Sequence, residues 1–240
     1  NVLHYTLELG EEYVGKRYDA FFTKIPVNKI DSHRDKVEDM IPQLPGKLII
    51  KEYPTGRASV STIESHIAKS TSMGFKPDLI IIDYVDLLSS RKTNRERKDE
   101  IDDIYTSTKG LAKQLDLPIW SVSQVNRAGA QDNVIQGDKA AGSYDKIMIT
   151  DFCMSLSRKK EDKVNNTGRF HLMKNRYGMD GITFGIEADT STGHFVVKNE
   201  YVEGDEPEAS ALQPRSNKFD TDVDTFDKAQ LRKKFFELNP

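Results

Sequence analysis

The 240-residue sequence predicts an α/β fold with a central parallel sheet, an antiparallel extension on its C-terminal side and a disordered acidic tail. Up to residue 157, short apolar runs alternate with helix-like segments, which is typical of parallel βαβ units. After residue 168, two strand-like runs are joined by a glycine-containing turn, which predicts an antiparallel meander. Residues 201–227 contain eight acidic and two basic side chains and few apolar ones, which predicts a disordered linker.

Composition limits the classes of protein to consider. With 38 acidic and 35 basic side chains the net charge is −3, so any contact with nucleic acid must come from local clusters. Cys153 is the only cysteine, which excludes an intramolecular disulfide and a cysteine-based zinc site and fits a reducing compartment. No apolar run approaches the roughly 18 residues of a membrane span. We therefore expect no membrane contact and a cytoplasmic location, which would be the host cytoplasm for a viral protein.

The elements follow from residue periodicity and from breakers. Apolar runs predict strands at residues 2–9, 47–51, 79–82, 118–124 and 151–157. Helical spacing predicts helices at residues 11–22, 28–45, 60–72 and about 99–115. The stretch 143–150 fits either a helix or a strand. Residues 157–167 read as a polar turn, and residues 169–176 and 182–186 read as antiparallel strands joined by a turn at 178–181.

These elements define three regions. Residues 1–200 form the α/β core, residues 201–227 form the acidic linker, and residues 228–240 form a short basic helix. That helix has Leu231, Phe235 and Leu238 on one side and is too short to be stable alone, so we expect it to dock on another surface. The chain begins inside a strand-like run with Asn1, and we expect it to be part of a longer protein.

Three polar side chains close predicted strands. Asp83 ends the buried run LIII, where an ionised carboxylate is costly unless a metal bound to phosphates compensates it. Glu8 closes the first strand and could activate water beside that metal. Gln124 closes the fourth strand and could hydrogen-bond a γ-phosphate. The alternatives are a strand that ends in a solvated turn, a surface glutamate and an ordinary strand-end amide.

A phosphate-binding loop of the form G-x-x-x-x-G-K-S/T has one near-match, GEEYVGKR at residues 10–17. We reject this match because Glu11 and Glu12 would place two anions beside the phosphates. In addition, Arg17 stands where a hydroxyl should bind magnesium. The phosphate loop is therefore absent from this sequence.

Two groups of cations are candidates for phosphate contacts. Lys174 and Arg176 are two residues apart in a predicted strand, so they share a face and could clamp phosphates, including those of a neighbouring subunit. A loop rich in basic residues could bind a nucleic-acid backbone; its cations are Arg91, Lys92, Arg95, Arg97 and Lys98. The alternatives are a charged edge strand and a solvated loop. No two histidines have metal-ligand spacing, so we expect none of the five to bind metal.

The sequence as a whole resembles the DnaB-like replicative helicases, most closely those of large tailed phages. The resemblance covers about residues 1–197 and rests on motifs in the family's order: NVLHYTLEL, KLIIKEYPTG, PDLIIIDYVDLL, PIWSVSQ and KNRYG. It implies a RecA-like ATPase core in a homo-hexameric ring that uses ATP and Mg²⁺ to move along single-stranded DNA and unwind a duplex. A primase and a helicase loader are further partners that the resemblance implies.

The resemblance also implies roles for individual residues. The position of Glu8 matches the catalytic glutamate, Asp83 the Walker B acid, which holds magnesium directly or through water, and Gln124 the strand-end sensor. Lys174 and Arg176 match cations that reach the adjacent subunit's nucleotide. The loops after Asp86 and after Gln124 face DNA, the second of them carrying Arg127.

The missing phosphate loop departs from the family pattern. We therefore expect that this chain alone neither binds ATP tightly nor hydrolyses it. Two alternatives remain for the function. One is a non-hydrolysing DNA-binding or assembly module derived from the same fold. The other is a RecA-like recombinase, against which the KNRYG strand argues.

Overall fold

The described part of the chain comprises residues 1–90, 96–125, 134–135 and 145–201 of a computed structural model. The chain divides into two units, Asn1–Ala209 and Ser210–Pro240, and every described residue belongs to the first. The predicted acidic linker beyond Tyr201 and the predicted helix at 228–240 lie outside the described residues. None of the described helices is both long enough and apolar enough to cross a membrane.

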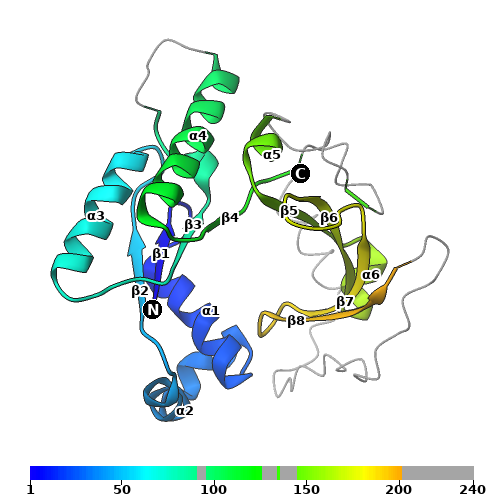
Figure 1. Cartoon of the computed structure of the whole chain (residues 1–240). Helices are drawn as coiled ribbons and strands as arrows, with labels where there is room; N and C mark the ends of the chain where they lie inside the picture. The colour runs from blue at the N-terminus through cyan, green and yellow to red at the C-terminus, as the bar shows by residue number, and fades with distance from the viewer. Residues whose placement is uncertain (91–95, 126–133, 136–144, 202–240) are drawn as a thin grey trace, which may run out of the picture. The chain divides into compact units, whose positions relative to one another are not determined.

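Four parallel strands form the first sheet in the order β2-β1-β3-β4 (Figure 1). The strands are β1 (Val2–Thr6), β2 (Leu48–Glu52), β3 (Leu79–Asp83) and β4 (Ile119–Ser121). Because all four strands run in the same direction, their carboxyl ends meet at one edge. Thr6 pairs there with Glu52 on one side and with Asp83 on the other.

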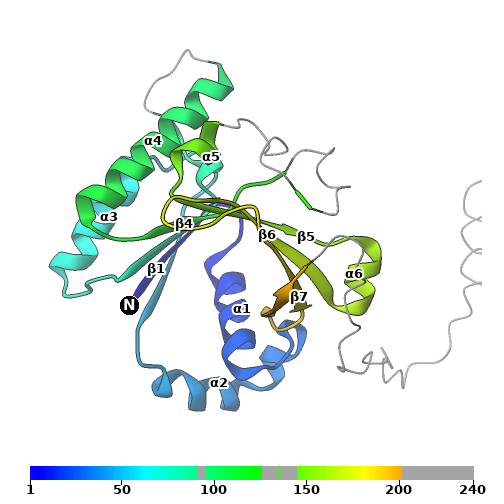
Figure 2. The same ribbon diagram turned by 45° about the vertical axis from the view of Figure 1, so that its right-hand side comes forward.

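Helices cover both faces of this sheet. Leu3 and Tyr5 of β1 and Ile80 of β3 are fully buried against α3 (Val60–Ser72) and α4 (Arg97–Leu115). The opposite face is covered by α1 (Glu11–Thr23), which lies across the sheet from α3 and α4 (Figure 2). On that face the hydroxyl of Tyr18 in α1 is 2.9 Å from Nδ1 of His4. Alternate residues of each strand therefore serve two separate interfaces.

Four antiparallel strands form the second sheet in the order β5-β6-β7-β8. They are β5 (Phe152–Ser157), β6 (Thr167–Asn175), β7 (Thr183–Asp189) and β8 (His194–Glu200). The short helix α5 (Asp145–Ile149) precedes β5, and α6 (Lys160–Asn165) connects β5 to β6. The predicted antiparallel extension is thus present, and it has two strands more than the sequence predicted. β8 follows the two predicted strands, and β5, which the sequence placed with the parallel units, pairs antiparallel with β6 instead.

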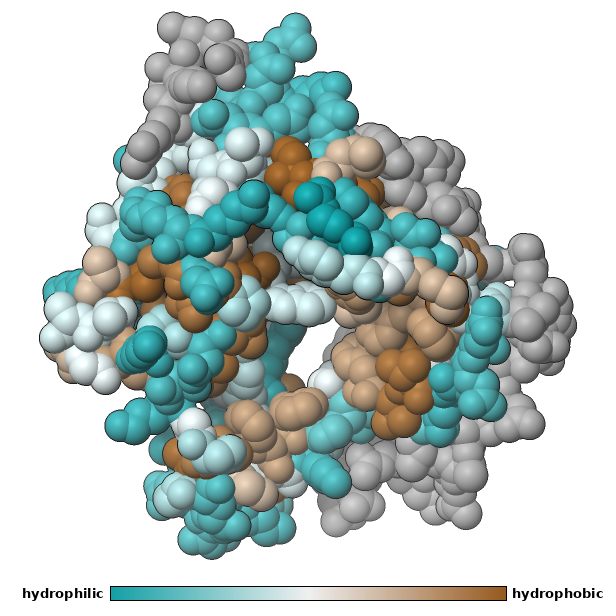
Figure 3. All heavy atoms as spheres, in the orientation of Figure 1, coloured by the Kyte–Doolittle hydropathy of each residue, from teal (hydrophilic) through white to brown (hydrophobic). Residues whose placement is uncertain are grey.

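Apolar side chains lie on the surface of the antiparallel sheet (Figure 3). Large exposed apolar residues occur on its two outer strands: Phe152, Met154 and Leu156 on β5 and Phe195, Val196 and Val197 on β8. Grouped apolar residues of this kind are typical of surfaces that contact another protein segment.

Two strands end earlier than predicted because side chains take over their backbone hydrogen bonds. β1 stops at Thr6, whose hydroxyl donates to the carbonyl of Leu9 at 2.7 Å and accepts from the amide of Leu9 at 3.2 Å. β4 stops at Ser121, whose hydroxyl donates to the carbonyl of Ile82 at 2.8 Å and accepts from the amide of Val85 at 3.0 Å. Glu8 and Gln124 therefore follow their strands instead of closing them.

Two further predictions are corrected and one ambiguity is resolved. The helix predicted at 28–45 is three short pieces, η1 (Val27–Ser32), α2 (Arg34–Met40) and η2 (Ile41–Gln43), with Pro42 inside the last. The polar turn predicted at 157–167 contains helix α6, whose residue Asp162 accepts a hydrogen bond from the amide of Lys159 at 2.7 Å. The ambiguous stretch at 143–150 holds helix α5.

Candidate functional site

Asp83 ends β3 at the carboxyl edge of the parallel sheet, and Glu8 and Gln124 follow β1 and β4 at the same edge, where Tyr84 also lies. Nε2 of Gln124 donates to the Tyr84 hydroxyl at 3.3 Å. Burial raises the pKa of this hydroxyl, and the negative charges of Glu8, Asp86 and Asp83 raise it further. These three carboxylates therefore act on one phenol, although Glu8 follows β1 whereas Asp83 ends β3 and Asp86 belongs to η3.

Asp83 lies on the face of the sheet that α1 covers. Burial lowers the pKa of His4 and raises that of Tyr18, and the charge of Asp83 raises both. Within the part of the chain that the structure describes, the carboxylates of Asp83 and Glu8 neither accept a hydrogen bond nor form an ion pair. Both are thus available to a ligand.

These oxygen donors fit magnesium, which proteins hold through one or two carboxylates together with water and substrate phosphates. Among the described residues, no three His, Cys, Asp or Glu side chains are grouped so that they could hold a metal ion. Asp83 would therefore hold magnesium with oxygen atoms from phosphate and water, not within a site made only of protein ligands.

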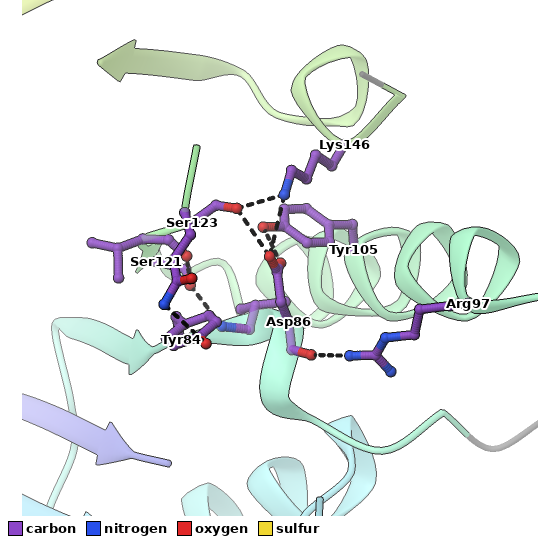
Figure 4. A network of polar contacts seen from close by, with 10 residues as sticks. Tyr84, Asp86, Arg97, Tyr105, Ser121, Ser123 and Lys146 are labelled. Atoms are coloured by element: carbon purple, nitrogen blue, oxygen red, sulfur yellow. Dashed lines mark hydrogen bonds and ion pairs between the residues drawn. The ribbon is translucent and has the colours of Figure 1, made fainter. Parts of the chain in front are cut away.

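Next to these residues, the carboxylate of Asp86 lies at the centre of a network of polar contacts (Figure 4). Asp86 belongs to η3 (Val85–Leu87), which directly follows β3. Its Oδ1 accepts from the Tyr105 hydroxyl at 2.7 Å, and its Oδ2 accepts from the Ser123 hydroxyl at 2.9 Å and from Nζ of Lys146 at 3.2 Å. Nζ of Lys146 also donates to the Ser123 hydroxyl at 2.5 Å. The network joins η3, α4, the segment after β4, and α5.

The sequence reasoning did not identify this network as part of a site. Asp86 is a polar residue in the apolar run IIIDYVDLL, and Lys146 is the one cation in the stretch YDKIMIT. Both are therefore visible as polar residues in apolar surroundings. Their pairing is not visible, because they are 60 residues apart and a single sequence carries no information about their contact.

Lys174 reaches α5, and Arg176 reaches the segment that joins α5 to β5. Nζ of Lys174 donates to the carbonyls of Ile147 and Met148 in α5. Nε of Arg176 lies 3.3 Å from Oδ1 of Asp151, which also pairs with Lys109. Burial lowers the pKa of Lys174, and the nearby charge of Arg176 lowers it further. Half of the Arg176 side chain remains exposed.

The predicted DNA-contacting cations are only partly described. Arg91, Lys92, Arg95 and Arg127 lie outside the described residues. Arg97 begins α4, where it donates to the carbonyl of Asp86 at 2.6 Å and pairs with Glu100 at 3.2 Å. Lys98 pairs with Asp145 at the start of α5 at 3.0 Å. Both of these cations lie at the surface and carry ion pairs within the chain.

Comparison with known sequences places this geometry in a family context. The family described as "DnaB-like helicase C terminal domain" matches residues 1–208. The "DnaB-like replicative helicase" of Enterobacteria phage T4 is 25% identical over 194 residues, which are 74% of this chain and 40% of the phage protein. "Replicative DNA helicase DnaB" of Helicobacter pylori (strain ATCC 700392 / 26695) is 27% identical over 130 residues, which are 52% of this chain and 26% of that protein. The chain thus spans less than half the length of these relatives.

Solved structures show the same fold. One of them, described as an ATPase domain, superimposes with a TM-score of 0.71 at 24% identity, covering 82% of this chain and 74% of that one. A structure described as a DnaB-like replicative helicase and its interactions with primase gives a TM-score of 0.70 at 24% identity, covering 81% and 51%. The predicted RecA-like α/β core, with its parallel sheet and antiparallel extension, is confirmed.

Proposed function

Because this chain belongs to the DnaB-like helicase C-terminal domain family, we propose that it is the ATPase core of a phage-type hexameric replicative DNA helicase. The observation that carries this proposal is that Asp83 ends β3 at the carboxyl edge of a parallel sheet, while Glu8 and Gln124 follow the two neighbouring strands at the same edge. Ligands of open parallel sheets bind at this edge. The match to a helicase family disfavours the recombinase alternative.

In the proposed reaction, a magnesium ion bound to ATP would supply neutralisation of charge on the transferring phosphoryl group. Asp83 would hold that metal directly or through water. Glu8 accepts a proton from the attacking water, and its lack of a partner within the described residues leaves it free to do so. Gln124 contacts the γ-phosphate through its amide and is linked to Tyr84, so nucleotide occupancy would reorient the start of the following loop.

Lys174 and Arg176 would act on the nucleotide of the adjacent subunit. The Arg176 side chain is half exposed, and its Nε lies 3.3 Å from the carboxylate of Asp151, which Lys109 also neutralises. A phosphate in the neighbouring subunit carries more charge than this shared carboxylate and would compete with it for the guanidinium. The apolar residues exposed on β5 and β8 support assembly with further chains.

Single-stranded DNA would contact the loops after Asp86 and after Gln124, whose cations are Arg91, Lys92, Arg95, Arg97, Lys98 and Arg127. Such contacts depend on salt and are mostly independent of sequence. Arg97 and Lys98 would exchange their present carboxylate partners for phosphates. A primase and a loader are the remaining proposed partners.

The 240 residues contain no G-x-x-x-x-G-K-S/T sequence, so the amides and the lysine that cradle phosphates must come from elsewhere in a complete helicase. The chain by itself would then neither bind ATP tightly nor hydrolyse it. A non-hydrolysing DNA-binding or assembly module is the second candidate, and the same missing loop favours it.

Replacing Glu8 with Gln in the complete helicase tests the proposal. Loss of the catalytic base should lower kcat for ATP by about a hundredfold or more, while the Kd for ATP stays within about threefold because Glu8 does not hold the phosphates. Glu12→Gln, the same change on the exposed side of α1, is the matched control and should keep wild-type turnover.

Two results would contradict the assignment. The first is unchanged turnover in Glu8→Gln: if both proteins hydrolyse ATP, Glu8 is not the catalytic base, and if neither does, the non-hydrolysing module is favoured. Loss of ATP binding in Glu8→Gln would show that this carboxylate supports the nucleotide and does not activate water.

A further inference from the structure

The ion pair between Asp86 and Lys146 is buried beside the proposed nucleotide site. The side chain of Lys146 is 2% exposed and that of Asp86 is 13% exposed. Removing two charges from water costs several kcal/mol per ion, so such a pair is weak evidence for a role in stability alone. Its position therefore needs a reason beyond packing.

The two ends of the network are adjacent to proposed site residues. Asp86 is three residues after Asp83, and Ser123 directly precedes Gln124. The single hydroxyl proton of Ser123 is donated to Asp86, and its oxygen accepts from Lys146, so Ser123 contacts both charges of the pair. A shift of Gln124 on contact with a γ-phosphate would therefore change the geometry of both hydrogen bonds.

Helix α5 carries this contact to the cations. Lys146 holds α5 to the edge of the parallel sheet, and the carbonyls of Ile147 and Met148 hold Nζ of Lys174. Asp151, which follows α5, holds Arg176. The five-residue helix α5 and the residues directly after it thus connect the carboxyl edge of the parallel sheet to both cations that we propose to act on the neighbouring subunit.

We propose that Lys146 is a positioning residue: its ion pair with Asp86 and Ser123 fixes α5, and α5 places Lys174 and Arg176 against the nucleotide of the adjacent subunit. This inference rests on the proposed function. The pair would make the placement of the cations depend on the state of Gln124 in the same subunit. Each subunit would then signal its own nucleotide state to its neighbour's site.

Subunit complementation in the complete helicase tests the proposal. Lys146→Met should lower kcat by about tenfold, because misplacing a transition-state contact by about 1 Å has an effect of this order or larger, with the Kd for ATP unchanged. Mixed with Glu8→Gln subunits, which keep their cations, Lys146→Met subunits should regain ATPase activity. In the mixed ring, some sites combine the intact Glu8 of a Lys146→Met subunit with the correctly placed cations of a neighbouring Glu8→Gln subunit.

A mixture of Arg176→Ala and Glu8→Gln subunits is the reference, because it tests directly whether Arg176 acts on the nucleotide of the adjacent subunit. If this reference regains activity and the Lys146→Met mixture does not, the positioning role is wrong while the proposed function stands. If neither mixture regains activity, the trans assignment of Arg176 in the proposed function is wrong, and the inference falls with it. Wild-type kcat in Lys146→Met would also overturn the inference.

Two further measurements separate positioning from structural support. The triple variant Asp86→Leu, Tyr105→Phe and Lys146→Met replaces the pair with apolar groups and should recover stability, yet its kcat should stay at the level of Lys146→Met. A recovered kcat would show that only packing matters. In the 240-residue chain, Trp120 is the only tryptophan, and its ring lies 5.8 Å from that of Phe152 in β5. Its emission should shift to longer wavelength in Lys146→Met, and an unchanged spectrum would count against movement of α5 and β5.

Discussion

Two buried ion pairs use the same chemistry for different connections. Asp162 and Arg169 are 2.8 Å apart with side chains 5% and 8% exposed, and they are only seven residues apart in the sequence. They tie α6 to the strand that follows it. Asp86 and Lys146 are 60 residues apart and tie the edge of the parallel sheet to α5. A local pair can fix only one connection, whereas the distant pair fixes the relation between elements that carry different parts of the proposed site.

The donors around each carboxylate differ as well. Asp162 accepts from the amide of Lys159, from the Thr167 hydroxyl and from Arg169, all within its own connection. Asp86 accepts from side chains on three separate elements, α4, α5 and the segment after β4. Loss of the local pair should therefore affect stability, and loss of the distant pair should affect communication between sites.

The largest effect on stability is expected for Arg169→Met. This change leaves the Asp162 carboxylate buried without its cation and should lower the free energy of unfolding by about 3 to 5 kcal/mol. In the complete helicase, kcat per folded ring should remain at the wild-type level, because Arg169 contacts no proposed site residue. Urea unfolding and ATPase assays measure the two quantities. Lys198→Met, which breaks the more exposed pair with Glu187, is the control.

A smaller loss of stability is expected for Lys146→Met, about 1 to 3 kcal/mol. Each carboxylate keeps two other hydrogen-bond donors when its cation is replaced, but the Asp86 side chain is 13% exposed and that of Asp162 only 5%, so water compensates the charge of Asp86 better. Arg169→Met should therefore lose more stability but less activity than Lys146→Met. If Lys146→Met were both the less stable and the less active variant, its kinetic defect could be explained by unfolding.

The sequence was sufficient to predict the parts of the fold that depend on local pattern. The spacing of Val60, Ile63 and Ile67 predicted α3 with its observed bounds, and the run before Asp83 predicted β3. These elements bury apolar side chains at the period of their secondary structure, so the pattern is contained in the segment itself.

The parts that were missed depend on contacts between distant residues. β4 ends at Ser121 because of hydrogen bonds to Ile82 and Val85, which belong to another part of the chain. Helix α6 is short, and it is held by the contact of Asp162 with Arg169 more than by its own propensity. The same limit applied to the site: its strand-end residues were visible, but the pairing of Asp86 with Lys146 was not.

The smallest expected effect is on the pH dependence of the free energy of unfolding, and it comes from the charge of Asp162 alone. Burial raises the pKa of this carboxyl, but hydrogen bonds from the Lys159 amide and from Arg169 outweigh burial and hold the pKa below its ordinary value of 3.8. Because the pKa is lower in the folded state, the ionised carboxylate stabilises the fold above about pH 4 and loses this contribution as the pH falls through the folded-state pKa.

Comparing wild type with Asp162→Asn isolates this contribution, since all other titrating groups are common to both. The difference in their free energies of unfolding, measured in urea, should be constant from about pH 6 to pH 4 and should shrink below that, because Asp162 then takes up a proton and resembles the amide. A difference that already vanishes near pH 5 would mean that Arg169 does not stabilise the ionised form. The contact between Asp162 and Arg169 would then depend on hydrogen bonding and not on the charge of the carboxylate. Only Asp86 and Lys146 would act as an ion pair, and the two contacts could not be compared as equivalents.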